Sequence, residues 1–148
     1  MSQKRNISEQ ELMGLIQREE NILTSKKSYY SKTQSLLIET IKTIETLKEV
    51  EKSPEKIYFM AGIGVMIEAK ITNTKTVKRS FSENGYFEEN IKDTQKWLEK
   101  RKKNIEVQLK KISEDIQKSE EQLKNMIGIY KKIEEEKQKL FSKNISTK

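Results

Sequence analysis

Carboxylates, hydroxyls and lysine amines are the main side chains in this sequence that could carry out bond-making chemistry, because its 148 residues include no His and no Cys. Without imidazole or thiolate groups, the chain lacks the commonest general base, a cysteine nucleophile and the usual zinc ligands. Two carboxylates act as acid and base only where a cleft perturbs one of them, and nothing in the sequence indicates such a cleft. We therefore predict that the protein is not an enzyme and holds no metal or cofactor.

A short glycine pair, Gly62-Ile63-Gly64, is the feature closest to a phosphate-binding loop. A dinucleotide-binding motif needs a third glycine and a following helix, whereas a strand pattern follows here. We predict that these glycines form a turn and that no nucleotide binds.

The densest basic run is Lys100 to Lys103, in a chain with a net charge of +7 and a pI near 9.4. Nucleic-acid binding would normally add stacking aromatic residues, and only Trp97 is close. From Lys92 to Lys139 the sequence carries 14 basic and 10 acidic residues, so the two signs are mixed. We predict a solvated helix face here, with contact to an acidic partner subunit or client as the alternative. The sequence does not favour nucleic acid as a partner.

Residues 8–52 have the pattern of one long helix, with no Pro and a single Gly. Ser8 and Glu11 are spaced as a capping box at its start, and Pro54 ends it, because proline disfavours helix at the residue before it. Apolar residues recur in adjacent pairs seven residues apart, which indicates one side of a coiled coil. These are Leu15 and Ile16, Ile22 and Leu23, Tyr29 and Tyr30, and Leu36 and Leu37, followed by Ile41, Ile44 and Leu47.

A second long helix is predicted over residues 91–141, with residues 142–148 as a tail. Polar residues such as Lys26, Thr33 and Ser119 interrupt both apolar stripes, and such layers weaken coiled-coil packing. We expect the two helices to fold back as an antiparallel coiled-coil hairpin that is easy to open. The heptad positions of the second helix are Leu98, Ile105, Ile112, Ser119, Met126, Ile133 and Leu140, with Leu109, Ile116, Leu123 and Tyr130 between them.

Residues 57–90 change to a period of two, which is the spacing of one face of a strand. The pattern predicts strands at 57–61, 65–71, 76–81 and 86–88, with turns at 72–75 and at Asn84-Gly85. Two hairpins bury too little area to be stable alone, so their edges need copies from other subunits. The predicted assembly residues are Ile57, Phe59, Ile63, Val65, Ile67, Ile71, Val77, Phe81, Tyr86 and Phe87.

The predicted fold class is mainly α: a long antiparallel coiled-coil hairpin with two small β-hairpins between its helices, in a single domain over residues 1–148. The apolar fraction of 33% suits this fold, because each rod buries one stripe and neighbouring subunits complete the β core. The longest apolar run, residues 57–67, is shorter than the roughly 20 residues of a membrane-spanning helix, and no secretory signal is recognisable. We expect a cytoplasmic protein that does not contact membranes.

Helix, two hairpins and helix, in this order, resemble an α-class prefoldin subunit. Four matching segments are similar to the family's GxxxxKAKI strand, its aspartate-lysine-valine turn, its GxGYYVE hairpin and its FLEKR helix start. They are residues 62–71 (GIGVMIEAKI), Thr76-Val77, residues 84–88 (NGYFE) and residues 97–101 (WLEKR). Two departures are Glu83-Asn84-Gly85, which keeps one glycine of the expected pair, and the polar stretch Lys78-Arg79-Ser80. Two hairpins match the α class, because β-class subunits have one.

The resemblance implies an ATP-independent co-chaperone that assembles, with a second α-class subunit and four β-class subunits, into a heterohexamer. Its hairpins would form a β-barrel, and six coiled coils would hold unfolded clients such as actin and tubulin for transfer to a group II chaperonin. It also implies that the helix ends away from the hairpins contact clients; ordinary packing of these ends is the alternative. The residues concerned are Leu12, Leu15, Ile16, Met126, Ile127, Tyr130, Ile133, Leu140 and Phe141.

A coiled-coil scaffold within a prefoldin-like regulatory complex is the alternative function. A pure scaffold would need no alternating strands between its helices, so the pattern of residues 57–90 favours the chaperone.

Overall fold

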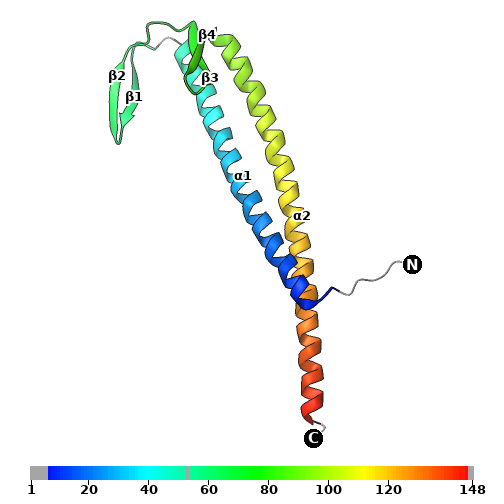
Figure 1. Cartoon of the computed structure of the whole chain (residues 1–148). Helices are drawn as coiled ribbons and strands as arrows, with labels where there is room; N and C mark the ends of the chain where they lie inside the picture. Colours follow the sequence, from blue (N-terminus) through cyan, green and yellow to red (C-terminus); the bar gives the residue numbers. More distant parts are fainter. Residues whose placement is uncertain (1–6, 53, 147–148) are drawn as a thin grey trace, which may run out of the picture. The chain divides into compact units, whose positions relative to one another are not determined.

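Two long helices with two antiparallel β-hairpins between them make up the protein (Figure 1). The computed structural model describes residues 7–52 and 54–146. This order of elements confirms the predicted fold class. The elements are helix α1 (Glu9–Glu51), strands β1 (Ile57–Gly62), β2 (Val65–Ala69), β3 (Thr76–Ser82) and β4 (Gly85–Asn90), and helix α2 (Ile91–Ser146).

The chain divides into two compact units. The terminal unit joins the part of α1 up to residue 32 with the part of α2 from residue 109 onward, and the hairpin unit comprises residues 33–108. Within the terminal unit the helices are antiparallel, because Glu9 forms an ion pair with Lys137 whereas Lys27 pairs with Glu120 at 2.7 Å. Within the hairpin unit, the Nζ atom of Lys92 at the start of α2 lies 2.8 Å from Oε1 of Glu51 at the end of α1.

The start of α1 is the predicted capping box. The Ser8 backbone N–H donates a hydrogen bond to Oε2 of Glu11 (2.8 Å), and the Glu11 N–H donates to Oγ of Ser8 (3.2 Å). These two bonds satisfy backbone donors that have no partner inside the helix. The helix ends at Glu51, before the predicted stop at Ser53-Pro54, of which Ser53 lies outside the described residues.

In each apolar pair of α1, the second residue is the more deeply buried. Leu23 is 8% exposed, whereas Ile22 beside it is 40% exposed. The other pairs behave alike, since the first residue of each is exposed and the second is half-buried. The covered positions therefore follow in steps of three and four, the spacing of a heptad seam. They are Leu12, Ile16, Glu19, Leu23, Lys26, Tyr30, Thr33, Leu37, Thr40, Ile44 and Leu47.

The buried stripe of α2 follows the predicted register over most of its length. Leu98 and Ile105 are buried, and Ser119 is the most deeply buried side chain among the described residues. Leu140, the last predicted heptad position, is instead exposed. The stripe therefore ends before the helix does.

Helix α2 is five residues longer than predicted, because it continues from Phe141 to Ser146. Residues 142–146, predicted as a tail, are helical. This stretch contains no Pro or Gly, and Ile145 lies one turn after Phe141, so no residue stops the helix at position 141.

The first hairpin turns at the glycines predicted to form a turn. Gly64 has a φ of +69°, in the left-handed region that glycine adopts without a steric penalty. The pairs on either side run from Ile57 opposite Ala69 to Gly62 opposite Val65.

Ile71, predicted to lie in the second strand, lies outside it, because β2 ends at Ala69. If the pairing continued, Ile71 would stand opposite Glu55, next to Pro54. Because β1 begins at Ile57, no strand residue stands opposite Ile71.

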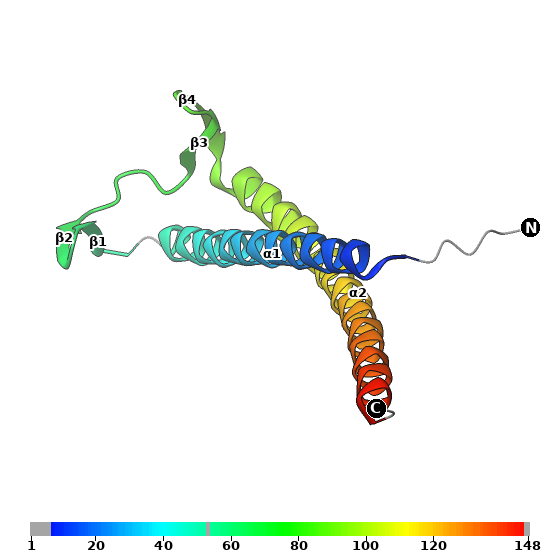
Figure 2. The ribbon, with the colours of Figure 1, turned by 60° about the horizontal axis from the view of Figure 1, so that its bottom comes forward.

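The second hairpin pairs β3 with β4 from Thr76 opposite Asn90 to Ser82 opposite Gly85, and it is a separate sheet from the first (Figure 2). The chain reverses at Glu83 and Asn84, one residue before the turn predicted at Asn84-Gly85, because Gly85 is already the first residue of β4 and pairs with Ser82. Glycine suits position 85 because an added Cβ would lie 2.5 Å from a ring carbon of Phe81. A larger residue would therefore require this ring to move.

Candidate functional site

Both faces of the first hairpin expose large apolar side chains. Phe59 stands opposite Ile67 on one face, and Met60 stands opposite Met66 on the other, since successive strand residues point to opposite sides. These four side chains are between 46% and 68% exposed. A hairpin of two strands is marginally stable in water, so this one needs additional strands or side chains to cover its faces.

The predicted assembly residues are placed on the two hairpins and just after β2, and most are open to contact. Phe59, Ile63, Val65, Ile67, Phe81 and Tyr86 are exposed, whereas Ile57, Ile71, Val77 and Phe87 are half-buried. Three further exposed residues, which were not among those predicted, occupy the second face: Tyr58, Met60 and Met66. The signal for them was the unbroken apolar run itself, which leaves neither strand face polar.

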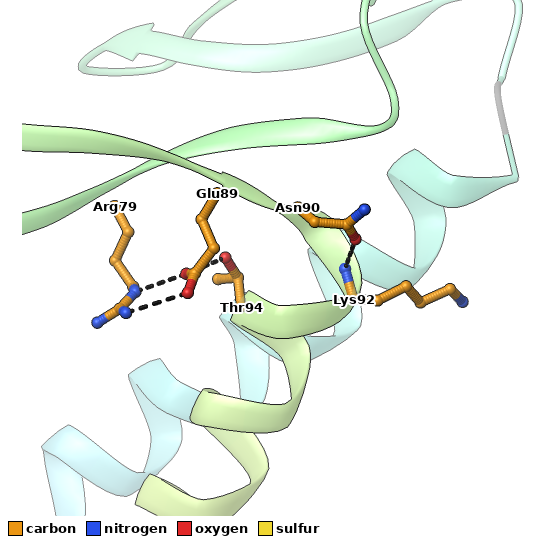
Figure 3. Close-up of polar contacts among 5 residues, drawn as sticks. All are labelled: Arg79, Glu89, Asn90, Lys92 and Thr94. Carbon is orange, nitrogen blue, oxygen red and sulfur yellow. Dashed lines mark hydrogen bonds and ion pairs between the residues drawn. The ribbon is translucent and has the colours of Figure 1, made fainter.

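The second hairpin is joined to α2 through the carboxylate of Glu89, which is bonded to both Thr94 and Arg79 (Figure 3). Nε of Arg79 donates a hydrogen bond to Oε2 of Glu89 (2.8 Å), and its Nη2 donates to Oε1 (3.2 Å). Oγ1 of Thr94, in the first turn of α2, donates to the same Oε2 (2.7 Å). The guanidinium fork matches a carboxylate in this two-point geometry, which a lysine cannot reproduce.

Aromatic rings on two elements close over the same guanidinium. Arg79 Cζ lies 4.5 Å from the ring centre of Phe87 on β4 and 4.3 Å from that of Trp97 on α2. Both distances are within the range of cation–π attraction. One side chain of β3 therefore contacts β4 and α2 together, and we call Arg79, Phe87, Glu89, Thr94 and Trp97 the hairpin anchor.

The ion pairs near the start of α2 shift the pKa values of their members. Hydrogen bonds from Arg79 and then Thr94 hold the pKa of Glu89 below its usual value, and Glu89 raises the pKa of Arg79. The pKa of Glu51 is lowered in the same way by Lys92 and then by the amide of Gln95. These carboxylates therefore stay charged to lower pH than ordinary ones.

The N-terminus of α2 has its own cap within this region. Oδ1 of Asn90 accepts a hydrogen bond from the backbone N–H of Lys92 at 2.8 Å, the geometry of an N-cap residue (Figure 3). The Ile91 N–H donates to the carbonyl of Lys75 at 2.9 Å, so the start of α2 is also tied to the loop before β3. Sequence reasoning missed the anchor, because Arg79 and Glu89 meet only when β3 and β4 are paired.

The predicted client-contact residues fall into two groups in the terminal unit. Leu12 is buried, and five others are half-buried in the seam or beside it: Ile16, Met126, Ile127, Tyr130 and Ile133. Leu15, Leu140 and Phe141 are exposed, the last two at 63% and 68%. The structure exposes four further apolar residues near the helix ends, Ile7, Met13, Ile129 and Ile145.

The end of α2 continues beyond the start of α1 (Figure 1). Glu9 in the first turn of α1 pairs with Lys137, so residues 138–146 of α2 extend past this contact. Phe141 lies in a shallow groove of about 430 Å³ with Lys137 and two neighbouring polar residues. Ile127 lies in a second groove of about 450 Å³, whose apolar wall is completed by Leu123.

Tyr130 forms a contact between the helices in the terminal unit. Its hydroxyl donates to Sδ of Met13 on α1 at 3.6 Å. Burial raises the pKa of Tyr130, and the neighbouring Glu134 raises it further. Tyr130 and Met13 are therefore brought together, whereas Phe141 lies further along α2.

A polar layer interrupts the seam of the terminal unit, as predicted. Lys26 of α1 donates a hydrogen bond from Nζ to Oγ of Ser119 on α2 at 2.8 Å. Ser119 is only 2% exposed, so this bond stands where an apolar layer would otherwise pack.

Within the described residues, no group of three acidic side chains could hold a metal ion. Neither α1 nor α2, over the residues that the structure describes, contains an apolar stretch long enough to span a membrane.

A family model described as "Prefoldin subunit" matches residues 16–138. Among solved structures, the cryo-EM structure of filamentous PFD from Methanocaldococcus jannaschii is similar, with a TM-score of 0.64 and 13% sequence identity. The similarity covers 78% of this chain and 97% of that chain, and at this identity it shows the fold alone. No curated protein matches the sequence.

Proposed function

This chain belongs to the prefoldin subunit family, and we propose that it is the α-class subunit of a cytoplasmic, hexameric, ATP-independent co-chaperone. Family and fold together make it a prefoldin-type chaperone subunit. We propose further that it assembles with a second α-class subunit and four β-class subunits.

The observation that carries the assembly is the bare first hairpin. Phe59, Met60, Met66 and Ile67 leave apolar surface on both of its faces. Apolar burial stabilises by roughly 25 cal/mol per Å², and unpaired strand edges attract further strands. Hairpins of neighbouring subunits would satisfy both needs by forming one barrel.

The presence of two separate hairpins supports the α class. β1–β2 and β3–β4 are distinct two-stranded sheets, whereas a β-class subunit would have one hairpin. The two hairpins also differ in their contacts. Arg79 of the hairpin anchor joins the second hairpin to α2 of its own chain. The exposed first hairpin is then available to partner subunits.

Client capture is proposed for the free ends of the coiled coil. Leu140 and Phe141 are exposed on a helix that continues past its partner, and Met13 is exposed near the start of α1. Contacts of this size are individually weak, but several coiled coils holding one unfolded chain add their effects by avidity. Methionine and aromatic side chains suit irregular partners.

Non-native actin and tubulin are the proposed clients, and a group II chaperonin is the proposed acceptor. The release step needs no nucleotide site in this subunit, since transfer to a tighter binder is sufficient. A coiled-coil scaffold in a prefoldin-like regulatory complex remains the second candidate, because two long helices would serve it equally well. The exposed hairpin favours the chaperone.

Native mass spectrometry of the chain expressed with β-class and second α-class subunits tests this proposal. We expect a hexamer containing one copy of this chain. Ile67→Asp, which puts a charge on the exposed face of β2, should abolish it, whereas Thr72→Asp in the following loop should leave it intact. A lone chain that forms a stable helical dimer without strand signal in circular dichroism would instead support the scaffold.

A further inference from the structure

A groove lined by lysines lies between α1 and α2 in the hairpin unit. Its volume is about 490 Å³. Five lysines and one glutamate line it, which gives a formal charge of +4. Ile44, only 4% exposed, and Gln95 complete the lining. The lysines are Lys48 on α1 and Lys92, Lys96, Lys100 and Lys103 on α2.

Part of the basic run at positions 100–103 lines this groove. Neither the proposed subunit assembly nor the proposed client contacts at the helix ends involve this run. Lys100 and Lys103 enter the groove, whereas Arg101 lies with its Cζ 5.5 Å from the ring centre of Trp97. Lys92 pairs with Glu51. Lys48, Lys96, Lys100 and Lys103 form no ion pair with another residue that the structure describes. Four positive charges therefore gather beside a small apolar floor without neutralising partners.

We propose that this groove binds an acidic, extended segment of a client polypeptide, a proposal that rests on the proposed chaperone function. Lys96 and Lys100, neither of which has an ion-pair partner among the described residues, are four residues apart, which places them about 6 Å apart along a helix. Alternate side chains of an extended chain repeat every 6.6 to 6.8 Å or so. Acidic residues at every second position of such a segment would therefore meet successive lysines.

The row from Lys92 to Lys103 is about 16 Å long, which is the length of about five residues of an extended chain.

The same region is poorly suited to nucleic acid. Single-stranded binding sites present aromatic faces on which bases stack. Trp97, the single tryptophan of the chain, is already covered by Arg79 at 4.3 Å and approached by Arg101 at 5.5 Å.

Fluorescence anisotropy with the assembled complex, using a short fluorescein-labelled peptide that alternates Glu and Thr, tests the proposal. Lys96→Glu with Lys103→Glu should weaken binding by about tenfold or more, because two attractions become repulsions. The control is Lys111→Glu with Lys118→Glu, two exposed lysines equally spaced on the same helix. This pair should change the affinity by less than about twofold, since it alters only the net charge.

Four results would overturn the proposal. They are equal losses in both double variants, no binding of the peptide by the unaltered complex, tighter binding of a helix-forming Glu/Ala peptide of the same charge, or tighter binding of a single-stranded oligonucleotide to the same lysines. Lys96→Gln with Lys103→Gln provides a milder variant should charge reversal disturb assembly. Failure here is distinguishable from failure of the proposed function, because peptide binding is measured without any assay of client aggregation.

Discussion

The guanidinium of Arg79 on β3 donates two hydrogen bonds to the carboxylate of Glu89 on β4, with lengths of 2.8 Å and 3.2 Å. Both side chains are about one-fifth exposed, at 21% and 18%. Because Thr94 and Trp97 of α2 touch the same pair, the hairpin and the helix depend on one another.

Arg79→Ala should loosen the second hairpin from α2. The variant removes the ion pair and uncovers one face of Trp97, so we expect a red shift of tryptophan emission and a melting temperature lower by a few degrees. Trp97 is the single tryptophan, so its emission reports on the anchor alone. Arg79→Lys should give an intermediate shift of the emission, since lysine keeps the positive charge but cannot form both hydrogen bonds of the planar guanidinium. Lys78→Ala, exposed on the opposite face of β3, is the control; an unshifted emission in Arg79→Ala would contradict the anchor.

The same pair predicts a pH dependence of stability. The pKa of Glu89 is lowered in the folded protein by Arg79 and Thr94, so this pair stabilises the fold above the unfolded pKa of about 4.5. The stabilisation is lost as the pH falls through the lowered folded pKa. Denaturant unfolding should show a steeper loss of stability with acidification in the parent than in Glu89→Gln. If stability fell equally with pH in the parent and in Glu89→Gln, the pKa of Glu89 would be the same in the folded and the unfolded chain, which contradicts the prediction.

The Lys26–Ser119 layer should limit the stability of the terminal unit. Ser119→Ala removes the acceptor of a part-buried ammonium and should cost about 1 kcal/mol, whereas Lys26→Leu with Ser119→Leu should raise the melting temperature. Thermal melts by circular dichroism distinguish these outcomes. Removal of the exposed neighbouring pair, by Lys27→Ala with Glu120→Ala, should change little. A double leucine variant less stable than the parent would show that the layer is required for packing.

Leu140→Ser, Phe141→Ser and Ile145→Ser together should weaken client capture without affecting assembly. All three side chains are exposed, so their loss removes apolar contact surface rather than core. We expect severalfold less suppression of the aggregation of denatured actin, followed by light scattering. Ile38→Ser with Val107→Ser, which are also exposed but lie in the hairpin unit, should retain full suppression. Equal activity in both variants would remove the helix ends from the client site.

The same reduction in Met126→Ser, Tyr130→Ser and Ile133→Ser would be harder to interpret. These residues are half-buried, so their replacement also loosens the coiled coil. Exposure, which the sequence does not reveal, therefore decides which helix-end residues make clean probes.

Much of the fold could be predicted because its heptad and strand periods each repeat several times. The heptads gave both helices, the capping box gave the start of α1, and the alternation gave both hairpins. The choice within each apolar pair could not be made, because Ile22 and Leu23 are adjacent and both suit a seam. Burial in the folded chain decides it, since Leu23 is buried and Ile22 is exposed. Ile71 was wrongly placed in a strand for a related reason. The alternation of apolar residues continues to Ile71, but β1 has no residue opposite it.

The anchor lay beyond sequence reasoning because it depends on three elements at once. Arg79 and Glu89 are ten residues apart, and Trp97 is on another element. In the sequence, Arg79 stands out only as a polar residue in an expected strand.

The uncovered first hairpin also bears on how the cell must produce this chain. In the proposed assembly, Phe59, Met60, Met66 and Ile67 are exposed until another subunit covers them. Any excess of this subunit over its partners would expose an unpaired, aggregation-prone strand edge. Chaperones and proteases would then act on the surplus. Synthesis in step with partner subunits, or prompt degradation of the surplus, follows as a requirement of the architecture.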